Sequence, residues 1–233
     1  MSKRTFDNFD AFASNYRTIH SQNVKLSGAD SYYFAEMKVK YLQQFENDEP
    51  LQVLDIGCGD GTTGFFMQQY FPQWKLCGID VSEESIKVAQ KKNIAQAVFY
   101  EYNGTQIQAQ NESFDIVFIA GVLHHVNYSL HQLLIKEMAR VLKKSGRLYL
   151  FEHNPFNPVT KYLVNTCVFD KDARLLKSSY STQLLKLSGF HISKKQFIIF
   201  FPRKGILSKL IFLEKFLQWL PLGGQYAIKA VKL

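Results

Sequence analysis

Residues 51–61 constrain the fold of this chain more than any other stretch. They read Leu-Gln-Val-Leu-Asp-Ile-Gly-Cys-Gly-Asp-Gly, an apolar strand pattern that runs directly into three glycines at alternate positions. Glycine adopts positive φ and, because it has no Cβ, lets a ligand approach the backbone closely. Residues 62–71 follow with a helical pattern. Strand, glycine turn and helix in this order begin a doubly wound α/β sheet, whose ligands bind at the carboxyl ends of the strands.

Acidic residues after the first two predicted strands indicate which ligand binds. Residues 75–79 predict a short strand ending at Asp80, where a carboxylate can accept hydrogen bonds from both hydroxyls of a ribose. The glycine turn contains Asp60, with Asp55 at the strand end, and a dinucleotide fingerprint would need glycine where Thr62 stands. Carboxylates here suit a ligand with an ammonium and a sulfonium group better than a pyrophosphate. The predicted ligand is therefore S-adenosylmethionine (SAM).

The same residues resemble the motifs of class I SAM-dependent methyltransferases. Residues 53–61 resemble the first motif, 78–80 the acidic second motif, 113–126 the fourth, and 141–150 the Arg-Val-Leu-x-x-Gly-Gly entry into strand five. The resemblance covers residues 35–155, with the motifs in order and correctly spaced. The branch resembled is the small-molecule group that includes ubiquinone and menaquinone methyltransferases.

The resemblance implies the cofactor contacts residue by residue. The implied positions are Asp55, Gly57, Gly59, Asp80, Val81, Asn103, Gly104 and Ala120. Asn103 and Gly104 stand where the family usually has Asp-Ala, the pair that binds adenine. The amide oxygen of Asn103 can still accept a hydrogen bond from the adenine amino group, but it carries no charge.

From Leu51 onward, strand and helix patterns alternate, which predicts βαβ units and a parallel sheet. The later predicted strands are 75–79, 97–102, 113–120, 147–151, 192–201 and 225–233; the predicted helices are 29–45, 62–71, 128–143 and 182–188, with another opened by Ser82. Ser145 and Gly146 are expected to end the helix over 128–143. The predicted fold class is α/β, a doubly wound, mostly parallel, seven-stranded sheet of the Rossmann-like methyltransferase type. The resemblance implies an antiparallel last strand.

The chain, residues 1–233, is predicted to be one domain. Residues 49–155 are the predicted SAM-binding core, and residues 156–233 the substrate-side half. Residues 1–48 are expected to form a helical lid, because N-terminal helices cap the substrate pocket in the resembled family. Helical spacing supports this at Phe9, Phe12, Tyr16 and His20. The alternative is a helix that simply packs on the sheet.

Two clusters at predicted strand ends carry groups for catalysis. Methyl transfer is an in-line displacement that depends mainly on alignment, with a base where the acceptor is a hydroxyl. His153 is the first candidate for this base, with Glu152 as its orienting partner; orienting the loop is the alternative role for both. His124 is expected to face the pocket, and Tyr16 is a further candidate base. The resemblance gives His125 a structural role, bonding backbone across the entry to the next helix.

Asn154-Pro155-Phe156 resembles the Asn-Pro-Pro-Phe/Tyr box of nucleic-acid and protein amino-methyltransferases. That box follows strand four, whereas here the residues follow strand five and the second proline is missing. The loop is therefore interpreted as scaffolding for the substrate side rather than a base-flipping site.

Charge is divided unevenly along the chain. Residues 1–142 hold 12 Lys and Arg against 16 Asp and Glu, a balance of −4, whereas residues 143–233 hold 16 against 4, a balance of +12. The basic half suits an anionic substrate, an acidic membrane surface or nucleic acid; a solvated lysine surface is the alternative. Three cysteines without metal-ligand spacing predict no metal site and a cytoplasmic setting. The N-terminal residues lack the apolar core of a signal peptide.

Residues 197–222 are unusually apolar, with lysines among them. Leu and Ile recur on one predicted helical face at Ile206, Leu210, Leu213, Leu217 and Leu220. Such a helix roofs a hydrophobic pocket, lies on a membrane surface or packs inertly, and the pocket roof is the favoured interpretation. We expect this segment to select a hydrophobic acceptor, including a lipid-linked one.

The predicted function is transfer of the SAM methyl group to oxygen or activated carbon of a small, hydrophobic or anionic acceptor. A second hypothesis is an RNA or DNA methyltransferase, which the basic half favours and the absence of an appended nucleic-acid module disfavours. A third is a SAM-binding interaction protein without turnover, because the motifs indicate binding and not transfer.

Overall fold

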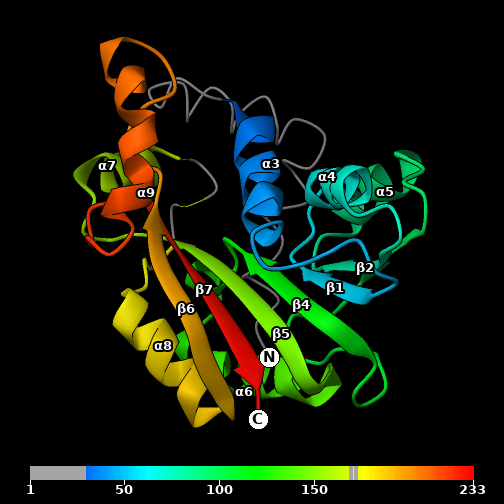
Figure 1. The fold of residues 1–233 in the computed structure, drawn as a ribbon. Helices are drawn as coiled ribbons and strands as arrows, with labels where there is room; N and C mark the ends of the chain where they lie inside the picture. Colours follow the sequence, from blue (N-terminus) through cyan, green and yellow to red (C-terminus); the bar gives the residue numbers. More distant parts are fainter. Residues whose placement is uncertain (1–29, 168–169, 171–172) are drawn as a thin grey trace.

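Seven strands form one sheet in the computed structural model, which describes residues 30–167, 170 and 173–233 (Figure 1). The strands are β1 (Gln52–Ile56), β2 (Lys75–Asp80), β3 (Ala97–Glu101), β4 (Phe114–Ala120), β5 (Leu142–His153), β6 (Phe190–Ile198) and β7 (Gln225–Lys232). Their order in the sheet is β3-β2-β1-β4-β5-β7-β6. Of the predicted lid over residues 1–48, residues 1–29, with Tyr16, lie outside the described residues.

The sheet is parallel except for its last strand. β1 pairs in parallel with β2 and β4, β2 with β3, and β4 with β5, whereas β7 runs antiparallel between β5 and β6. The predicted fold class and the antiparallel last strand are both confirmed. The order reverses between β1 and β4, and ligands of such sheets bind at this switch point.

The described helices lie on both faces of the sheet (Figure 1). They are α3 (Ser31–Leu42), α4 (Thr62–Tyr70), α5 (Glu83–Lys91), α6 (Tyr128–Val141), α7 (Pro158–Thr166), α8 (Ser178–Leu187) and α9 (Glu214–Leu217), with 3-10 helices η2 (Leu123–His125) and η4 (Ile206–Leu213). Short polar side chains begin several of them: the Asp30 carboxylate accepts from Tyr33 N at 2.8 Å and the Ser82 hydroxyl from Ser85 N at 3.1 Å. Such caps satisfy backbone donors left open by the helix start.

Each face of the sheet has its own core. Leu134 and Met138 of α6 pack with Leu185 of α8 in one buried cluster. On the opposite face, Leu42 of α3 and Met67 of α4 pack with other fully buried side chains. Burial on both faces explains why the central strand β4 reads as an almost continuous apolar run.

The passage from α6 into β5 differs from the prediction. The helix ends at Val141, and β5 begins at once with Leu142, which pairs with Phe114. The expected stop at Ser145 and Gly146 is wrong, because the last carbonyls of the helix accept from the segment entering β4, among them Val141 O from Ser113 N at 2.8 Å. Residues 143–146 instead form an irregularity within β5, where Ser145 has φ +60°.

The segment between β6 and β7 also differs from the prediction. β6 ends at Ile198, because Ile199 has φ +63°, and η4 and α9 follow in place of one continuous helix. Neither η4 nor α9 contains a buried residue, so the interpretation as a buried pocket roof is wrong. The large apolar side chains more than 45% exposed there are Ile206, Leu207, Phe212, Phe216, Trp219 and Leu222. We call residues 206–222 the apolar segment.

Anchoring at one side explains this exposure. Glu214 accepts from Phe200 N at 3.0 Å and from Phe201 N at 3.1 Å, and Phe197 N donates to Gln218 O at 2.8 Å. These bonds fix the polar side of the segment to the end of β6, so its apolar side chains point outward. None of the described helices is long and apolar enough to cross a bilayer.

Candidate active site

The glycine turn between β1 and α4 lies at the switch point of the sheet. Gly57 and Cys58 donate their backbone N–H groups to Ile79 O at 2.8 and 3.1 Å, which ties the turn to β2. Gly57 has φ +71°, and a Cβ there would lie 2.3 Å from a methyl carbon of Val122, so no side chain fits. Gly59 has φ +53°, but a Cβ there would meet nothing within 4 Å. The turn therefore presents bare backbone to open space at Gly59, where a ligand can approach.

Asp80 faces this turn from the end of β2. One carboxylate oxygen accepts from Gly59 N at 2.8 Å and the other from Ser82 N at 3.0 Å. Each oxygen has more than one lone pair, so both can accept further hydrogen bonds from ribose hydroxyls. The predicted role of Asp80 thus agrees with its position, and its side chain is held rigidly by the turn it serves.

Asp55 is the clearest sign of a cationic ligand. Its side chain is 4% exposed, and within the described part of the chain no donor reaches its Oδ2 atom. Burial and, second, the negative charge of Asp80 raise the pKa of Asp55 to about 7, against a smaller opposite effect of Lys38. A buried carboxylate oxygen without a partner is costly unless a bound group satisfies it. An ammonium group of the ligand would do so.

Asp60 does not serve the ligand, in contrast to the sequence interpretation of the turn. Its carboxylate accepts from Thr62 N at 3.2 Å and from the Thr62 hydroxyl at 2.9 Å, and Lys92 Nζ lies 2.8 Å away. The negative charge of Asp60 is therefore balanced by Lys92 within the protein, and its oxygens hold the start of α4.

The predicted adenine contact of Asn103 does not fit the structure. The Asn103 side-chain oxygen accepts from Thr105 N, Gln106 N and the Thr105 hydroxyl at 2.8–3.2 Å, which closes its own turn. Gly104 follows with φ +82° and is buried. An Asx turn uses the oxygen that the sequence interpretation had assigned to adenine.

The two remaining predicted cofactor positions lie near the same sheet edge. Val81 packs partly buried against the core cluster that contains Tyr102 and Ile107. Ala120 is the last residue of β4 and pairs with Phe151 of β5.

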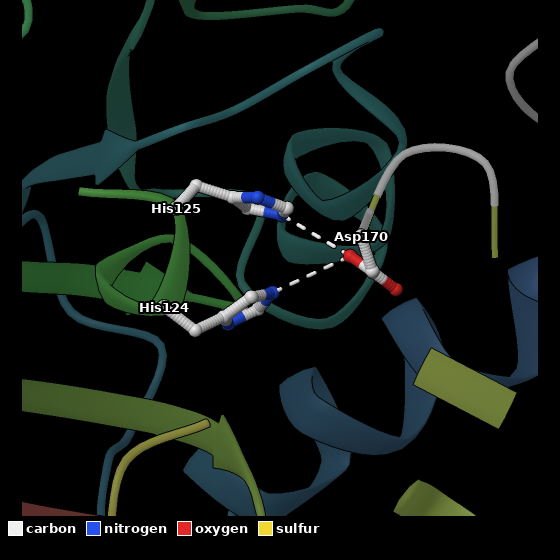
Figure 2. Close-up of side chains that lie close together, drawn as sticks. All are labelled: His124, His125 and Asp170. Atoms are coloured by element: carbon white, nitrogen blue, oxygen red, sulfur yellow. Dashed lines mark ion pairs between the residues drawn. The ribbon is translucent and has the colours of Figure 1, made fainter. Parts of the chain in front are cut away.

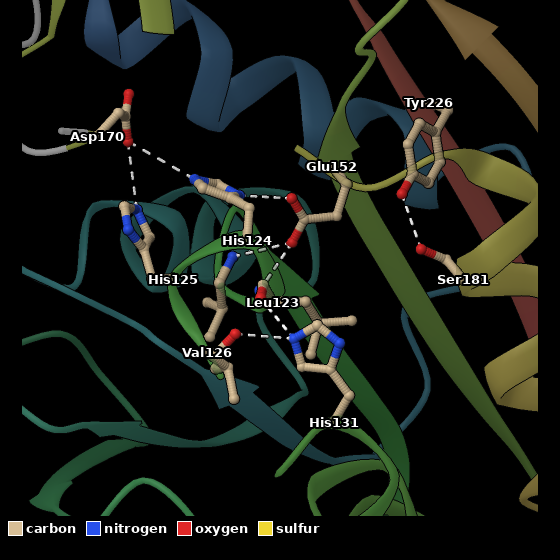
Figure 3. A network of polar contacts seen from close by, with 10 residues as sticks. Leu123, His124, His125, Val126, His131, Glu152, Asp170, Ser181 and Tyr226 are labelled. Atoms are coloured by element: carbon tan, nitrogen blue, oxygen red, sulfur yellow. Dashed lines mark hydrogen bonds and ion pairs between the residues drawn. The ribbon is translucent and has the colours of Figure 1, made fainter. Parts of the chain in front are cut away.

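A buried pair of charged groups joins η2 to β5 (Figure 3). One oxygen of Glu152 accepts from Leu123 N at 2.8 Å and from Val122 N at 3.1 Å, and the other lies 2.5 Å from His124 Nδ1. A carboxylate only accepts, so Nδ1 carries the hydrogen. Burial lowers the pKa of His124, but the Glu152 and Asp170 carboxylates outweigh it and raise that pKa to about 10.

The predicted pairing of Glu152 with His153 is therefore wrong. Adjacent residues of a strand point to opposite faces, so Glu152 orients His124 and turns away from His153. Burial, and then the positive charge of His124, lower the pKa of His153 to about 3. His153 is thus neutral near pH 7 and a weak base. Its ring centroid lies 5.2 Å from that of His124.

His131 has the role that the sequence interpretation gave to His125. Its Nε2 lies 2.9 Å from both Leu123 O and Val126 O (Figure 3). Its Nδ1 lies 2.9 Å from the Tyr180 hydroxyl. His131 thereby fastens the η2 loop to α6 and α8. No motif in the sequence marks it; it lies among the apolar positions of α6 and is fully buried.

Asp170 is the site residue that the sequence interpretation missed. One of its oxygens lies 3.3 Å from His125 Nε2 and 3.6 Å from His124 Nε2 (Figure 2). Burial raises the pKa of Asp170, but hydrogen bonds to the two imidazoles hold it well below its usual range. Asp170 lies far along the chain from both histidines, between α7 and α8, and no residue pattern in the sequence predicts this contact.

The Asn154 loop is scaffolding, as interpreted from the sequence. The side-chain amide of Asn154 donates to Gly223 O at 2.7 Å and to Pro221 O at 3.1 Å, and its oxygen accepts from Phe156 N at 3.1 Å. The side chain is 1% exposed. Its polar atoms are used to hold the loop before β7, not to bind an acceptor nitrogen.

Comparison with known proteins agrees with this fold and turn. Residues 53–146 match the family model of a methyltransferase domain. An uncharacterised methyltransferase of Bacillus subtilis is 33% identical over 119 residues, 49% of this chain and 46% of that protein. A ubiquinone biosynthesis O-methyltransferase of Pelagibacter ubique is 30% identical over 124 residues, 51% of this chain and 50% of that protein. Each match thus spans about half the length of the curated relative.

The whole chain is also similar to solved structures. A SAM-dependent methyltransferase of Thermotoga maritima, described as a possible histamine N-methyltransferase, matches 99% of this chain and 100% of its own, with a TM-score of 0.71 and 17% identity. The fold is that of the SAM-dependent methyltransferases, and the predicted resemblance is confirmed. The matched family model and the structural neighbours imply SAM as the methyl donor, and the unpartnered Asp55 oxygen and the open space at Gly59 fit it.

Proposed function

We propose that this protein is a SAM-dependent methyltransferase that methylates an oxygen or an activated carbon of a small acceptor. The observation that carries the proposal is the cradle at the switch point. It combines the open backbone at Gly59, the carboxylate of Asp80 and the unpartnered oxygen of Asp55. SAM supplies an electrophilic methyl group on its sulfonium; the chain has to bind and orient it.

Three residues bind and orient SAM in this proposal. Asp80 holds the ribose, because its oxygens lie beside the turn and can accept further hydrogen bonds. Asp55 pairs with the ammonium group, which removes the cost of its buried, unpartnered oxygen. Gly59 lets the ligand lie against the backbone. Alignment of donor and acceptor in a dry site then provides most of the acceleration.

The His153 ring lines the acceptor side in its uncharged form and does not act as a strong base. A pKa of about 3 makes proton uptake by its ring unfavourable near pH 7. This favours acceptors that ionise easily or that already carry a nucleophilic carbon, for which no strong base is needed.

A hydrophobic acceptor is supported by the apolar segment. Its exposed side chains include Phe216 at 62% and Trp219 at 75%. The exposed lysines Lys204, Lys209 and Lys215 lie in or next to it. Apolar side chains interleaved with lysines suit an anionic bilayer surface. We therefore propose that the protein meets a lipid-like acceptor at such a surface; the relative from Pelagibacter ubique, named for ubiquinone biosynthesis, agrees with this class.

The test is a transfer assay with methyl-labelled SAM on a panel of hydroxylated and activated-carbon acceptors of graded hydrophobicity, with SAM affinity measured by calorimetry. We expect one SAM per chain and label on one acceptor class. Replacing Asp80 by Ala should weaken SAM about ten- to hundredfold, since hydrogen bonds to a charged group contribute roughly 1.5–3 kcal/mol each. Glu49→Ala, which removes an exposed carboxylate on another loop, is the control.

Three outcomes separate the hypotheses. A folded protein that does not bind SAM overturns the proposal. SAM binding with no transfer to any acceptor favours a binding protein without turnover. Transfer of label to RNA or DNA and not to small molecules would show that the acceptor is a nucleic acid, which overturns the proposed acceptor class.

A further inference from the structure

We propose that His124, His125 and Asp170 bind a divalent transition-metal ion of the zinc type. Their ring nitrogens and carboxylate oxygen converge on one point between η2 and the segment before α8 (Figure 2). This inference goes beyond the proposed methyl transfer, because binding of the ion does not depend on SAM.

The distances between the three atoms suit an ion. Asp170 Oδ1 lies 3.3 Å from His125 Nε2 and 3.6 Å from His124 Nε2. All three ligand atoms lie within 4.8 Å of one another. Zinc bonds of about 2.0–2.1 Å in a tetrahedral arrangement place ligand atoms roughly 3.3–3.5 Å apart. Only small side-chain movements are needed to coordinate an ion.

The orientation of His124 is fixed from behind. Its Nδ1–H donates to Glu152 at 2.5 Å, which leaves Nε2 as the ring atom that faces Asp170 and His125. Histidines that bind metals commonly donate their second ring N–H to a carboxylate, which fixes ring and tautomer. Glu152 is itself held by Val122 N and Leu123 N. The His124 ring is 3% exposed, so this arrangement is built into the core and not a chance surface contact.

The donor set indicates a site with room for a further ligand. Two imidazoles and one carboxylate suit zinc and the related first-row ions, and three protein ligands leave at least one position open. The site follows β4 closely: a Cβ at Gly121 would lie 3.7 Å from the His124 ring. The proposed ion site thus lies at the sheet edge where the acceptor is expected.

The ion would change the chemistry of a hydroxyl acceptor; this consequence rests on the proposed function. An oxygen bound to the ion loses its proton more easily, here to water, because the ion stabilises the negative charge. That oxygen then forms the new O–C bond as the S–C bond of SAM breaks.

The experiment uses the full chain after treatment with a chelator. Zn²⁺ is titrated by calorimetry and Co²⁺ by its visible absorption, both without SAM. We expect one ion per chain and an absorption band of low-coordinate Co²⁺. His125→Ala and the isosteric Asp170→Asn should each weaken Zn²⁺ at least tenfold. His191→Ala, which removes an exposed histidine of β6, should leave the affinity unchanged.

The outcomes distinguish this inference from the proposed function. If wild-type chain that is folded by circular dichroism binds no stoichiometric ion, the metal site is refuted, whether or not SAM binds. Equal affinity in all three variants also refutes it. Ion binding by a chain that does not bind SAM would leave the metal site standing and refute the methyltransferase proposal.

Discussion

The glycine turn and the apolar segment differ in how their groups are partnered. The turn pairs most of its polar groups within the protein, whereas the segment leaves its apolar side chains exposed. In the turn, Gly59 and Ser82 donate to Asp80, and Asp60 is paired with Lys92, so nearly every group has a defined partner. In the apolar segment, neither η4 nor α9 has a buried residue. A region whose groups are held by internal contacts, with one oxygen of Asp55 left for the ligand, holds a small ligand in one geometry. A region that leaves apolar area in water suits the contact with a bilayer surface that we propose for it.

Gly59→Ala tests the first half of this comparison with the largest expected effect. The added methyl group occupies the open space at the turn, so we expect SAM affinity to fall at least hundredfold, about 2.7 kcal/mol or more. Gly189→Ala is the matched control, because Gly189 also has positive φ and an open Cβ position. Both variants carry a similar backbone strain, about 1–2 kcal/mol, and only the first should lose SAM in calorimetry. Equal affinity in both would show that the ligand does not approach Gly59.

The pKa of Asp55 predicts that SAM affinity changes about tenfold with pH. A cationic ligand binds the ionised carboxylate, so SAM affinity should rise with pH and level off above about 7, the pKa of Asp55. At one pH unit below that value only about a tenth of the carboxyl is ionised, which makes binding roughly tenfold weaker. Calorimetry between pH 5.5 and 8 measures the slope. Asp55→Asn should bind weakly at every pH, and a wild-type affinity that is flat over this range would contradict the assignment.

The same carboxyl should lower the stability of the ligand-free protein. Its pKa is raised on folding from 3.8 to about 7, so its contribution to stability is present below about pH 4 and lost as pH rises through 7. Asp55→Asn is therefore expected to raise the unfolding midpoint in urea at pH 8 and to change it little at pH 4. A midpoint that falls at pH 8 would show that Asp55 has a partner in the free protein.

The smallest expected effects concern the apolar segment in solution. Replacing Phe216 and Trp219 by Ser should change the free energy of unfolding by less than about 1 kcal/mol, because both side chains are mostly exposed. Flotation with anionic vesicles should fall severalfold, while SAM affinity stays unchanged. Leu187→Ser, at an apolar residue of α8 that is 66% exposed, is the control. Unchanged flotation in the double variant would mean that the segment has no part in membrane contact.

Sequence reasoning succeeded where the determinants of structure are local. The turn at Gly57 and Gly59 and the acid at Asp80 are set by neighbours in two successive βα units, so spacing alone located them. Residue order also predicted the sheet, because alternating strands and helices leave few arrangements.

It failed where contacts join distant parts of the chain. The Asp170 contact with His125 depends on how the chain between α7 and α8 returns over the sheet edge. Glu152 and His153 were paired by adjacency, although strand geometry separates them. The apolar residues around Phe216 have helical spacing, but periodicity does not say whether a face is covered.

The position of β7 also sets an order of assembly. β7 lies between β5 and β6 and pairs with both, although it comes after them in the chain. Until residues 225–232 have been synthesised, β5 has one unpaired edge and β6 has no strand to join. β5 carries Glu152, and the Asn154 loop that follows it is bonded to the turn just before β7. The acceptor side of the site is therefore completed late in synthesis, and the exposed edge of β5 is the point at which the nascent chain is most open to aggregation or chaperone binding.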